Sequence, residues 1–307
     1  MTPNMLKRLW AGVKRAFGDE SFEPYKIDAF SDHTVNTAYE TVKSDFSKTE
    51  TDSSKPSKPV QLIEEAKGAR GTSDRNKQIR AACIYLRHAQ LLTSTQDSSY
   101  PQEPTAAEAY HYAANEFRQL DLLDRAAQCY FNSAVSALLA SRAAATSDRT
   151  QALPLPLALR SAGRAKALYA SLGDDERSDR AHQLRQEVSR RGLALERKYE
   201  WILLYVWKVV TGYGASINRW FTALLFSLIA FALLYSAGLT FCYIKLANDA
   251  PSFPAITPVY LSVLNLLQFG SYTQIVPLHW SAQVILMLHG AVAFVLVGTG
   301  VTFLTKK

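Results

Sequence analysis

Two long stretches without charged residues in the last third of the chain limit what it can fold into. The first runs from Trp220 to Ile244, and the second runs from Trp280 to Thr305 and contains His289. As a helix, the first stretch is roughly 37 Å long at 1.5 Å per residue, enough to cross the ~30 Å hydrocarbon core of a bilayer. The pattern predicts an integral membrane protein with two spans.

Basic residues lie mainly outside the two spans. Lys245 is the one basic residue between them, apart from His279. The others close to the spans are Arg190, Arg191, Arg197, Lys198, Lys208, Arg219, Lys306 and Lys307. Because cytoplasmic loops are enriched in Lys and Arg, we expect both termini on the cytoplasmic side. No contiguous apolar stretch follows the N-terminal basic residues, so no cleavable signal peptide is expected.

The segment that joins the spans contains a third, shorter apolar stretch. Pro258 suits the first turn of a helix, and about ten to twelve helical residues fit before Gly270. Such a helix is too short to cross a bilayer. Irregular backbone at membrane depth is tolerated only where protein or a water-filled cavity covers it. Residues 254–277 are therefore predicted to form a re-entrant pore loop.

The pore loop carries a specific likeness in the residues Phe269, Gly270, Ser271, Tyr272, Thr273 and Gln274, followed by Ile275-Val276-Pro277. Over about residues 220–305 the chain resembles the two-transmembrane pore module of the potassium-channel superfamily, as found in bacterial ion channels. The selectivity filter of that family reads Thr-Val-Gly-Tyr-Gly-Asp, followed by an apolar pair and proline. Tyr272 and Ile275-Val276-Pro277 match it. The resemblance implies a cation-conducting pore built by four copies, because one loop cannot surround a pore.

Several replacements distinguish this loop from the family filter. Ser271 and Thr273 stand where the family has glycines, and Gln274 stands where it has aspartate. Successive carbonyls can line an axis only at backbone angles that glycine reaches freely and β-branched residues reach poorly. Phe269 also lacks the hydroxyl of the innermost oxygen ring. The loop therefore favours a weakly selective cation pore over a strict potassium channel. A pore closed by Phe269 side chains is the other interpretation.

Residues near the pore loop each allow two interpretations. Gly290 and Gly298 suit either a gating hinge or close helix packing. His289 either faces an aqueous cavity and takes part in gating, or is a neutral packing histidine. Asp249 either rings the outer mouth in a fourfold assembly, where it concentrates cations, or is a solvated loop residue.

Residues 199–219 precede the first span and contain a short aromatic stretch, Glu200 to Val210, that suits the headgroup region of a bilayer. The Gly212-Tyr213-Gly214 triplet lies on the cytoplasmic side of the first span, so it predicts an elbow and not a filter. A Thr-Gly-Tyr-Gly elbow before a span is similar to bacterial fusion proteins in which a repeat domain precedes this pore module. That likeness implies the bacterial inner membrane.

The N-terminal part begins with a basic amphipathic pattern and continues with polar sequence. Within residues 1–20, the apolar positions at helical spacing are Leu6, Leu9, Trp10, Val13 and Phe17. This helix is expected either to lie on an anionic membrane surface or to dock onto the protein, and a mitochondrial presequence is a third interpretation. Residues 21–58 are rich in Ser, Thr, Lys and Asp and predict a flexible linker.

Residues 59–198 predict a cytoplasmic, all-helical domain with helices at about 74–96, 104–119, 121–145, 157–172 and 175–199. The positions Tyr110, Ala113, Ala114, Phe117, Ala126 and Tyr130 resemble the small and aromatic pattern of tetratricopeptide repeats, and Ala165, Leu168, Tyr169, Leu172 and Ala181 repeat it loosely. The offset between the two is longer than a regular repeat. An irregular helical-hairpin array or a plain bundle fits, and such arrays bind peptides or other proteins.

No enzyme or cofactor site emerges from the composition. Cys83, Cys129 and Cys242 are isolated, and the histidines show no metal-ligand spacing. The net charge of +7 is explained by anionic lipid rather than nucleic acid, because the basic residues cluster beside the membrane. The sequence thus predicts an all-α, homotetrameric ion channel regulated by its helical domain. A non-conducting membrane-anchored scaffold and a regulatory channel subunit are the alternatives.

Overall fold

The computed structural model describes residues 22–27, 30–47, 58–70, 72–94, 104–144, 155–196, 198–214, 217–246, 257–267 and 275–305. Within these ranges the chain is all-α, apart from two short strands. The elements are α2 (His33–Ser47), α3 (Lys58–Gly68), α4 (Arg75–Ser94), α5 (Ala106–Gln119), α6 (Leu123–Ala144), α7 (Leu155–Ser171), α8 (Asp175–Leu195), α9 (Glu200–Thr211), α10 (Ile217–Thr240), β1 (Ile244–Leu246), α11 (Thr257–Leu266), β2 (Ile275–Pro277) and α12 (Trp280–Thr305). The chain divides into two compact units at about Trp201.

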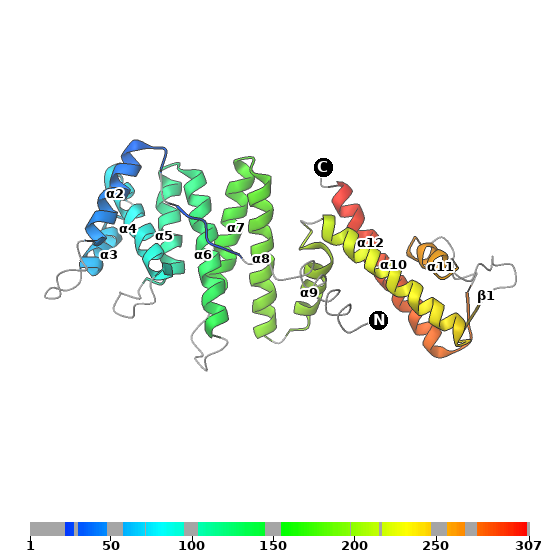
Figure 1. The fold of residues 1–307 in the computed structure, drawn as a ribbon. Helices are drawn as coiled ribbons and strands as arrows, with labels where there is room; N and C mark the ends of the chain where they lie inside the picture. Colours follow the sequence, from blue (N-terminus) through cyan, green and yellow to red (C-terminus); the bar gives the residue numbers. More distant parts are fainter. Residues whose placement is uncertain are drawn as a thin grey trace. The chain divides into compact units, whose positions relative to one another are not determined.

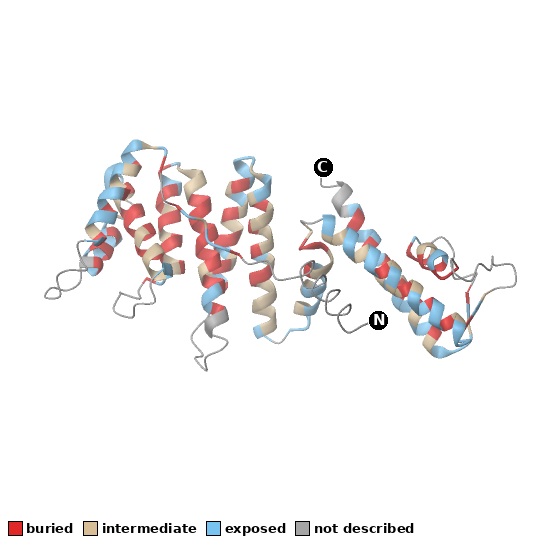
Figure 2. Cartoon of the chain, in the orientation of Figure 1, coloured by how far each residue is buried: buried red, intermediate tan, exposed pale blue. Residues whose placement is uncertain are grey.

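The first unit is a row of antiparallel helices. Helices α4 to α8 pack each against the next, and α2 and α3 pack on α4 (Figure 1). One continuous core of buried side chains runs through the row (Figure 2). The five helices predicted within residues 59–198 are all present, with ends within four residues of expectation. Of the repeat-like positions, Leu172 is 44% exposed and does not belong to the core.

Local signals in the sequence set the helix ends. Thr105 caps α5 through a capping box, in which its side chain accepts a hydrogen bond from the Glu108 backbone and Glu108 binds the Thr105 backbone. After α5, Asp121 adopts φ 63°, and the Leu122 amide donates to the Phe117 carbonyl at 2.9 Å. This is the Schellman pattern, which lets the chain reverse tightly into the next helix.

The expectation of a flexible linker over residues 21–58 is wrong for its described parts. Residues His33–Ser47 form helix α2, because four apolar residues recur at helical spacing on an otherwise polar segment. These four, which are all buried against the row of helices, are Val35, Tyr39, Val42 and Phe46. Residues 22–27 are extended and also pack on the row, with Ile27 fully buried. The predicted helix over residues 1–20 lies outside the described residues.

The second unit contains α9 to α12 and the two strands. The short stretch Glu200–Thr211 is helical as expected, and the elbow after it turns through left-handed backbone at Gly212, Tyr213 and Gly214. Glycine reaches such angles without strain, which explains two of these three positions. Helix α10 ends at Thr240 and not at Ile244. A left-handed Cys242 (φ 56°) closes it with the Schellman pattern, and the chain then enters β1.

Candidate functional site

Helices α10 and α12 are both long and apolar enough to cross a membrane. Only 22% of the most apolar stretch of α10, and 28% of that of α12, is buried in the single chain. Figure 2 colours much of both helices pale blue, for exposed residues. The exposed residues of the two helices include large apolar ones such as Leu233 (67% exposed) and Phe294 (72%). A chain that exposes so much apolar surface needs lipid or other subunits to cover it.

Helix α11 is the short helix predicted between the two spans. Its ten residues rise only about 15 Å, so it cannot cross a bilayer. It starts at Thr257 with Pro258 in its first turn, as expected from the sequence. It packs against both α10 and α12. The Ser262 hydroxyl donates to the Leu228 carbonyl of α10 at 3.0 Å, which fixes one side of the short helix to α10.

A buried polar cluster joins α11, α10 and α12, and we call Asn265, Tyr235 and His289 the polar triad. The Asn265 Nδ2 donates to the Tyr235 Oη at 2.8 Å, and the same oxygen lies 2.7 Å from His289 Nδ1. All three residues are 0% exposed. The Phe231 ring stacks on the imidazole, with centroids 3.8 Å apart and planes 4° from parallel. The Tyr235 hydroxyl of α10 therefore connects α11 and α12.

The polar triad contains two buried polar atoms without a partner among the described residues. The Asn265 amide nitrogen donates to the Tyr235 oxygen, and the direction of the bond between that oxygen and His289 Nδ1 depends on which ring nitrogen of His289 carries the hydrogen. His289 Nε2 and Asn265 Oδ1 have no hydrogen-bond partner in the described part of the chain. A partner group for these two atoms beside the short helix would be stabilising.

A two-stranded antiparallel ribbon fixes the residues that follow the predicted filter. Ile244, Lys245 and Leu246 of β1 lie opposite Pro277, Val276 and Ile275 of β2, respectively. The Leu278 amide also donates to the Tyr243 carbonyl at 2.9 Å. The Ile275-Val276-Pro277 sequence, which carries part of the resemblance to channel pore loops, is therefore held beside the end of α10. No sequence pattern predicts this pairing, because each strand has only three residues.

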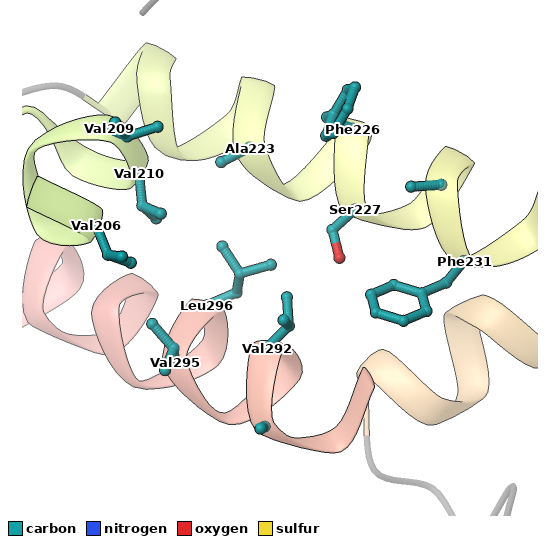
Figure 3. Close-up of a pocket in the computed structure, with 12 residues that line it drawn as sticks. Val206, Val209, Val210, Ala223, Phe226, Ser227, Phe231, Val292, Val295 and Leu296 are labelled. Atoms are coloured by element: carbon teal, nitrogen blue, oxygen red, sulfur yellow. The ribbon is translucent and has the colours of Figure 1, made fainter. Parts of the chain in front are cut away.

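An apolar pocket of about 570 Å³ lies between α9, α10 and α12 (Figure 3). Val206 and Val210 line it from α9, Ala223 from α10, and Val295 and Leu296 from α12. Ser227 supplies the one hydroxyl among its lining side chains. A pocket with this lining accepts an apolar group, such as an acyl chain or a side chain of a neighbouring subunit, and offers nothing to fix a charged ligand.

The predicted site residues divide into two groups. Phe269, Gly270, Ser271, Tyr272, Thr273, Gln274 and Asp249 lie outside the described residues, so their roles stay predictions. His289, Gly290 and Gly298 lie on α12, and the structure places His289 in the polar triad between three helices. Sequence reasoning missed Tyr235 and Asn265. Their signal was present, since both are polar residues within apolar helical stretches.

A second polar cluster lies inside the row of helices, outside the candidate spans. His111 Nδ1 lies 2.8 Å from Ser161 Oγ, and His111 Nε2 lies 3.4 Å from Arg164 Nη1. Because a guanidinium only donates, Nε2 accepts and Nδ1 carries the hydrogen, so the ring is neutral. Arg164 also donates to Asn115 Oδ1 and Tyr130 Oη. Burial first, and then nearby arginines led by Arg164, lower the pKa of His111 to about 4.

The shifted pKa of His111 predicts acid-sensitive stability of the helical unit. Well above pH 6.5, neither the folded nor the unfolded chain protonates this residue, and its contribution to stability is complete. As the pH falls towards 4, the unfolded chain binds a proton that the folded chain does not, so stability falls by up to about 3 kcal/mol. Urea denaturation followed by circular dichroism checks this, with His111→Gln as the matched variant. A stability difference between wild type and His111→Gln that stays constant from pH 7 to pH 4 would contradict the assignment.

The residues described here contain no group of three or more His, Cys, Asp or Glu side chains arranged to hold a metal ion. In comparisons with protein-family models, with curated proteins and with solved structures, the chain matches none of them.

Proposed function

We propose that four copies of this chain form a cation channel in a bacterial inner membrane, with both termini on the cytoplasmic side. The observation that carries the proposal is the placement of α11. It is a helix too short to cross a bilayer, and the polar triad holds it against two helices long enough to do so. A short helix followed by a returning strand between two spans is the layout of a re-entrant pore loop.

The need for several copies follows from the exposed surface of the two long helices. The outer faces of α10 and α12 are apolar and open in one chain, so lipid and neighbouring subunits would divide them. Closed rotational symmetry is the usual solution when identical chains surround one axis.

The proposed pore is weakly selective. Ser271 and Thr273 replace the glycines that let successive carbonyls face an ion, and Phe269 supplies no oxygen ring. Gly298 and His289 remain candidates for gating, and Asp249 for the outer mouth. The row of helices is the proposed regulatory element, since arrays of packed helices present extended binding surfaces for peptides and proteins.

Replacing Tyr272 by alanine is expected to change both the single-channel conductance and the ratio of sodium to potassium permeability. The tyrosine is the one filter side chain retained from the family pattern, so its loss alters the narrowest part of the pore. Planar-bilayer recordings with sodium or potassium as the only cation measure both quantities. Tyr199→Ala is the control, because Tyr199 precedes α9 and is 74% exposed. Equal conductance and permeability ratios for wild type and Tyr272→Ala would contradict the proposed filter.

A non-conducting membrane anchor is the second candidate, and the loss of both filter glycines favours it. The two candidates differ in oligomeric state, because an anchor has no need of a fourfold axis. The mass of the protein in detergent, measured by light scattering, is expected to correspond to four chains. A particle of one chain would support the anchor. Co-purification of this chain only with other channel subunits would instead indicate a regulatory subunit.

A further inference from the structure

The described N-terminal residues lie on the row of helices as a ligand would lie in a binding groove. Residues 22–27, which we call the strap, are extended and belong to neither a helix nor a sheet. Phe22 and Ile27 are buried and Tyr25 is half-buried, whereas Glu23, Pro24 and Lys26 face solvent. In Figure 1 the strap, in dark blue, crosses the row of helices. The spacing of its buried side chains gives it one face towards the helices.

Side-chain amides of the helices bind the main chain of the strap. Asn132 on α6 accepts from the Tyr25 amide at 2.6 Å and donates to the Tyr25 carbonyl at 2.8 Å. Gln90 on α4 donates to the Ile27 carbonyl at 2.9 Å, and its own oxygen accepts from the Tyr39 hydroxyl at 2.8 Å. Contacts of this kind fix the register of an extended segment without requiring a particular sequence. Asn132 is fully buried beneath the strap, so it would lose both bonds if the strap left.

An aromatic and cationic site holds the Tyr25 ring. Its centroid lies 4.8 Å from that of Phe131 and 6.5 Å from that of Tyr169. The guanidinium groups of Arg177 and Arg180 lie 5.6 Å and 5.4 Å from the same ring. An aromatic side chain held between rings and cations is a strong anchor for a peptide. The two arginines also favour acidic residues close to the aromatic one, such as Glu23 in the strap.

We propose that the groove formed by Gln90, Phe131, Asn132, Tyr169, Arg177 and Arg180 is a peptide-binding site that the strap occupies in the same chain, and that an extended segment of a partner protein displaces it. The partner segment has an aromatic residue two positions before an aliphatic one, with acidic residues close by. The strap lacks the hydrogen-bonded ladder of a helix or sheet, so it opens more readily than the helices beneath it. Binding of the partner would then release the N-terminal residues, a change that the proposed regulation of the pore could use.

The test uses the full chain in detergent and a fluorescent peptide of residues 21–31. A tethered strap competes at an effective concentration on the order of millimolar, so the wild-type chain should bind the peptide weakly. Tyr25→Gly combined with Ile27→Gly weakens the strap and leaves the groove intact. This variant is expected to bind the peptide at least about tenfold more tightly than wild type, since the competing segment has lost two of the three side chains that face the helices.

Two controls separate groove binding from other effects. Adding Asn132→Leu to the weakened variant should abolish binding, and a peptide carrying the same two glycine substitutions should not bind. In the wild-type chain, excess peptide should speed amide hydrogen exchange in the strap and leave α5 and α6 unchanged. Equal affinity of wild type and weakened variant would overturn the proposal. So would loss of the helical circular dichroism signal in the weakened variant, because the strap would then be part of the folding core. None of these measurements depends on ion current. Their results therefore test the peptide-binding site independently of whether the chain forms a channel.

Discussion

Replacing Tyr235 by phenylalanine is expected to destabilise the unit formed by α9 to α12 by about 2 kcal/mol and to reduce channel current. The change removes one oxygen and keeps the ring, so the Asn265 amide and His289 Nδ1 both lose their partner. A buried group left without a hydrogen bond costs about 1–3 kcal/mol, and interhelical hydrogen bonds in membranes are worth about 1–2 kcal/mol in model peptides. Because α11 is held through this hydroxyl, the loop after it should lose its position.

Detergent-induced unfolding in mixed micelles, followed by circular dichroism, measures the stability of the Tyr235 variant. Tyr243→Phe is the matched control, because Tyr243 is 48% exposed and lies outside the polar triad. The control should unfold at the wild-type detergent fraction. If Tyr235→Phe and Tyr243→Phe were equally stable and conducted equally well, the polar triad would not be what positions α11.

Alanine at Gly300 is expected to make the protein less stable than alanine at Gly298, by about 1–3 kcal/mol. An added Cβ at Gly300 would lie 2.6 Å from Cζ2 of Trp220, whereas one at Gly298 would meet nothing within 4 Å in the single chain. The Trp220 ring cannot move away freely, because its indole nitrogen donates to the Leu296 carbonyl at 2.8 Å. Gly300 is therefore needed for the contact between α10 and α12.

Comparing the two alanine variants isolates the effect of the steric clash between the added Cβ at position 300 and the Trp220 ring. Both gain the same intrinsic helix preference of about 1 kcal/mol over glycine, so that gain cancels in their difference. Detergent-induced unfolding gives the stability difference, and single-channel recording gives the open probability. If Gly298 is a gating hinge, Gly298→Ala changes the open probability at near wild-type stability. Equal stability of the two variants would show that Trp220 does not pack on Gly300 in the assembled protein.

The sequence alone predicts helices correctly where an apolar pattern continues over many residues. The five helices predicted within residues 59–198, the two long apolar helices and the short helix at Pro258 all follow from apolar patterns in the sequence. The prediction from sequence was wrong where only a few residues determine whether a helix forms or where it ends. Helix α2 was missed because its four apolar residues stand in a polar segment that resembles a linker by composition. The end of α10 was misplaced by four residues, because Cys242 adopts a left-handed turn that composition does not encode.

The polar triad and the strap were beyond sequence reasoning for a different reason. Tyr235, Asn265 and His289 are far apart in the chain, and only the packing of three helices brings them together. The bonds from Asn132 to the backbone of Tyr25 join residues 107 positions apart. No local pattern contains such pairs, because a side-chain amide that binds another segment's main chain imposes no spacing on its own neighbours.

Chemical modification during current recording shows whether the loop between the two long apolar helices lines a water-filled pore. Tyr272→Cys would be placed in a Cys242→Ser background, since Cys83 and Cys129 are buried and Cys242 is exposed. A membrane-impermeant, positively charged thiol reagent is then added during planar-bilayer recording. If the loop lines the pore, a steady cation current falls as the reagent modifies the cysteine at position 272, and the current of the Cys242→Ser background alone does not change. Complete modification at position 272 with an unchanged current, or no current from the unmodified tetramer, would contradict the proposed pore.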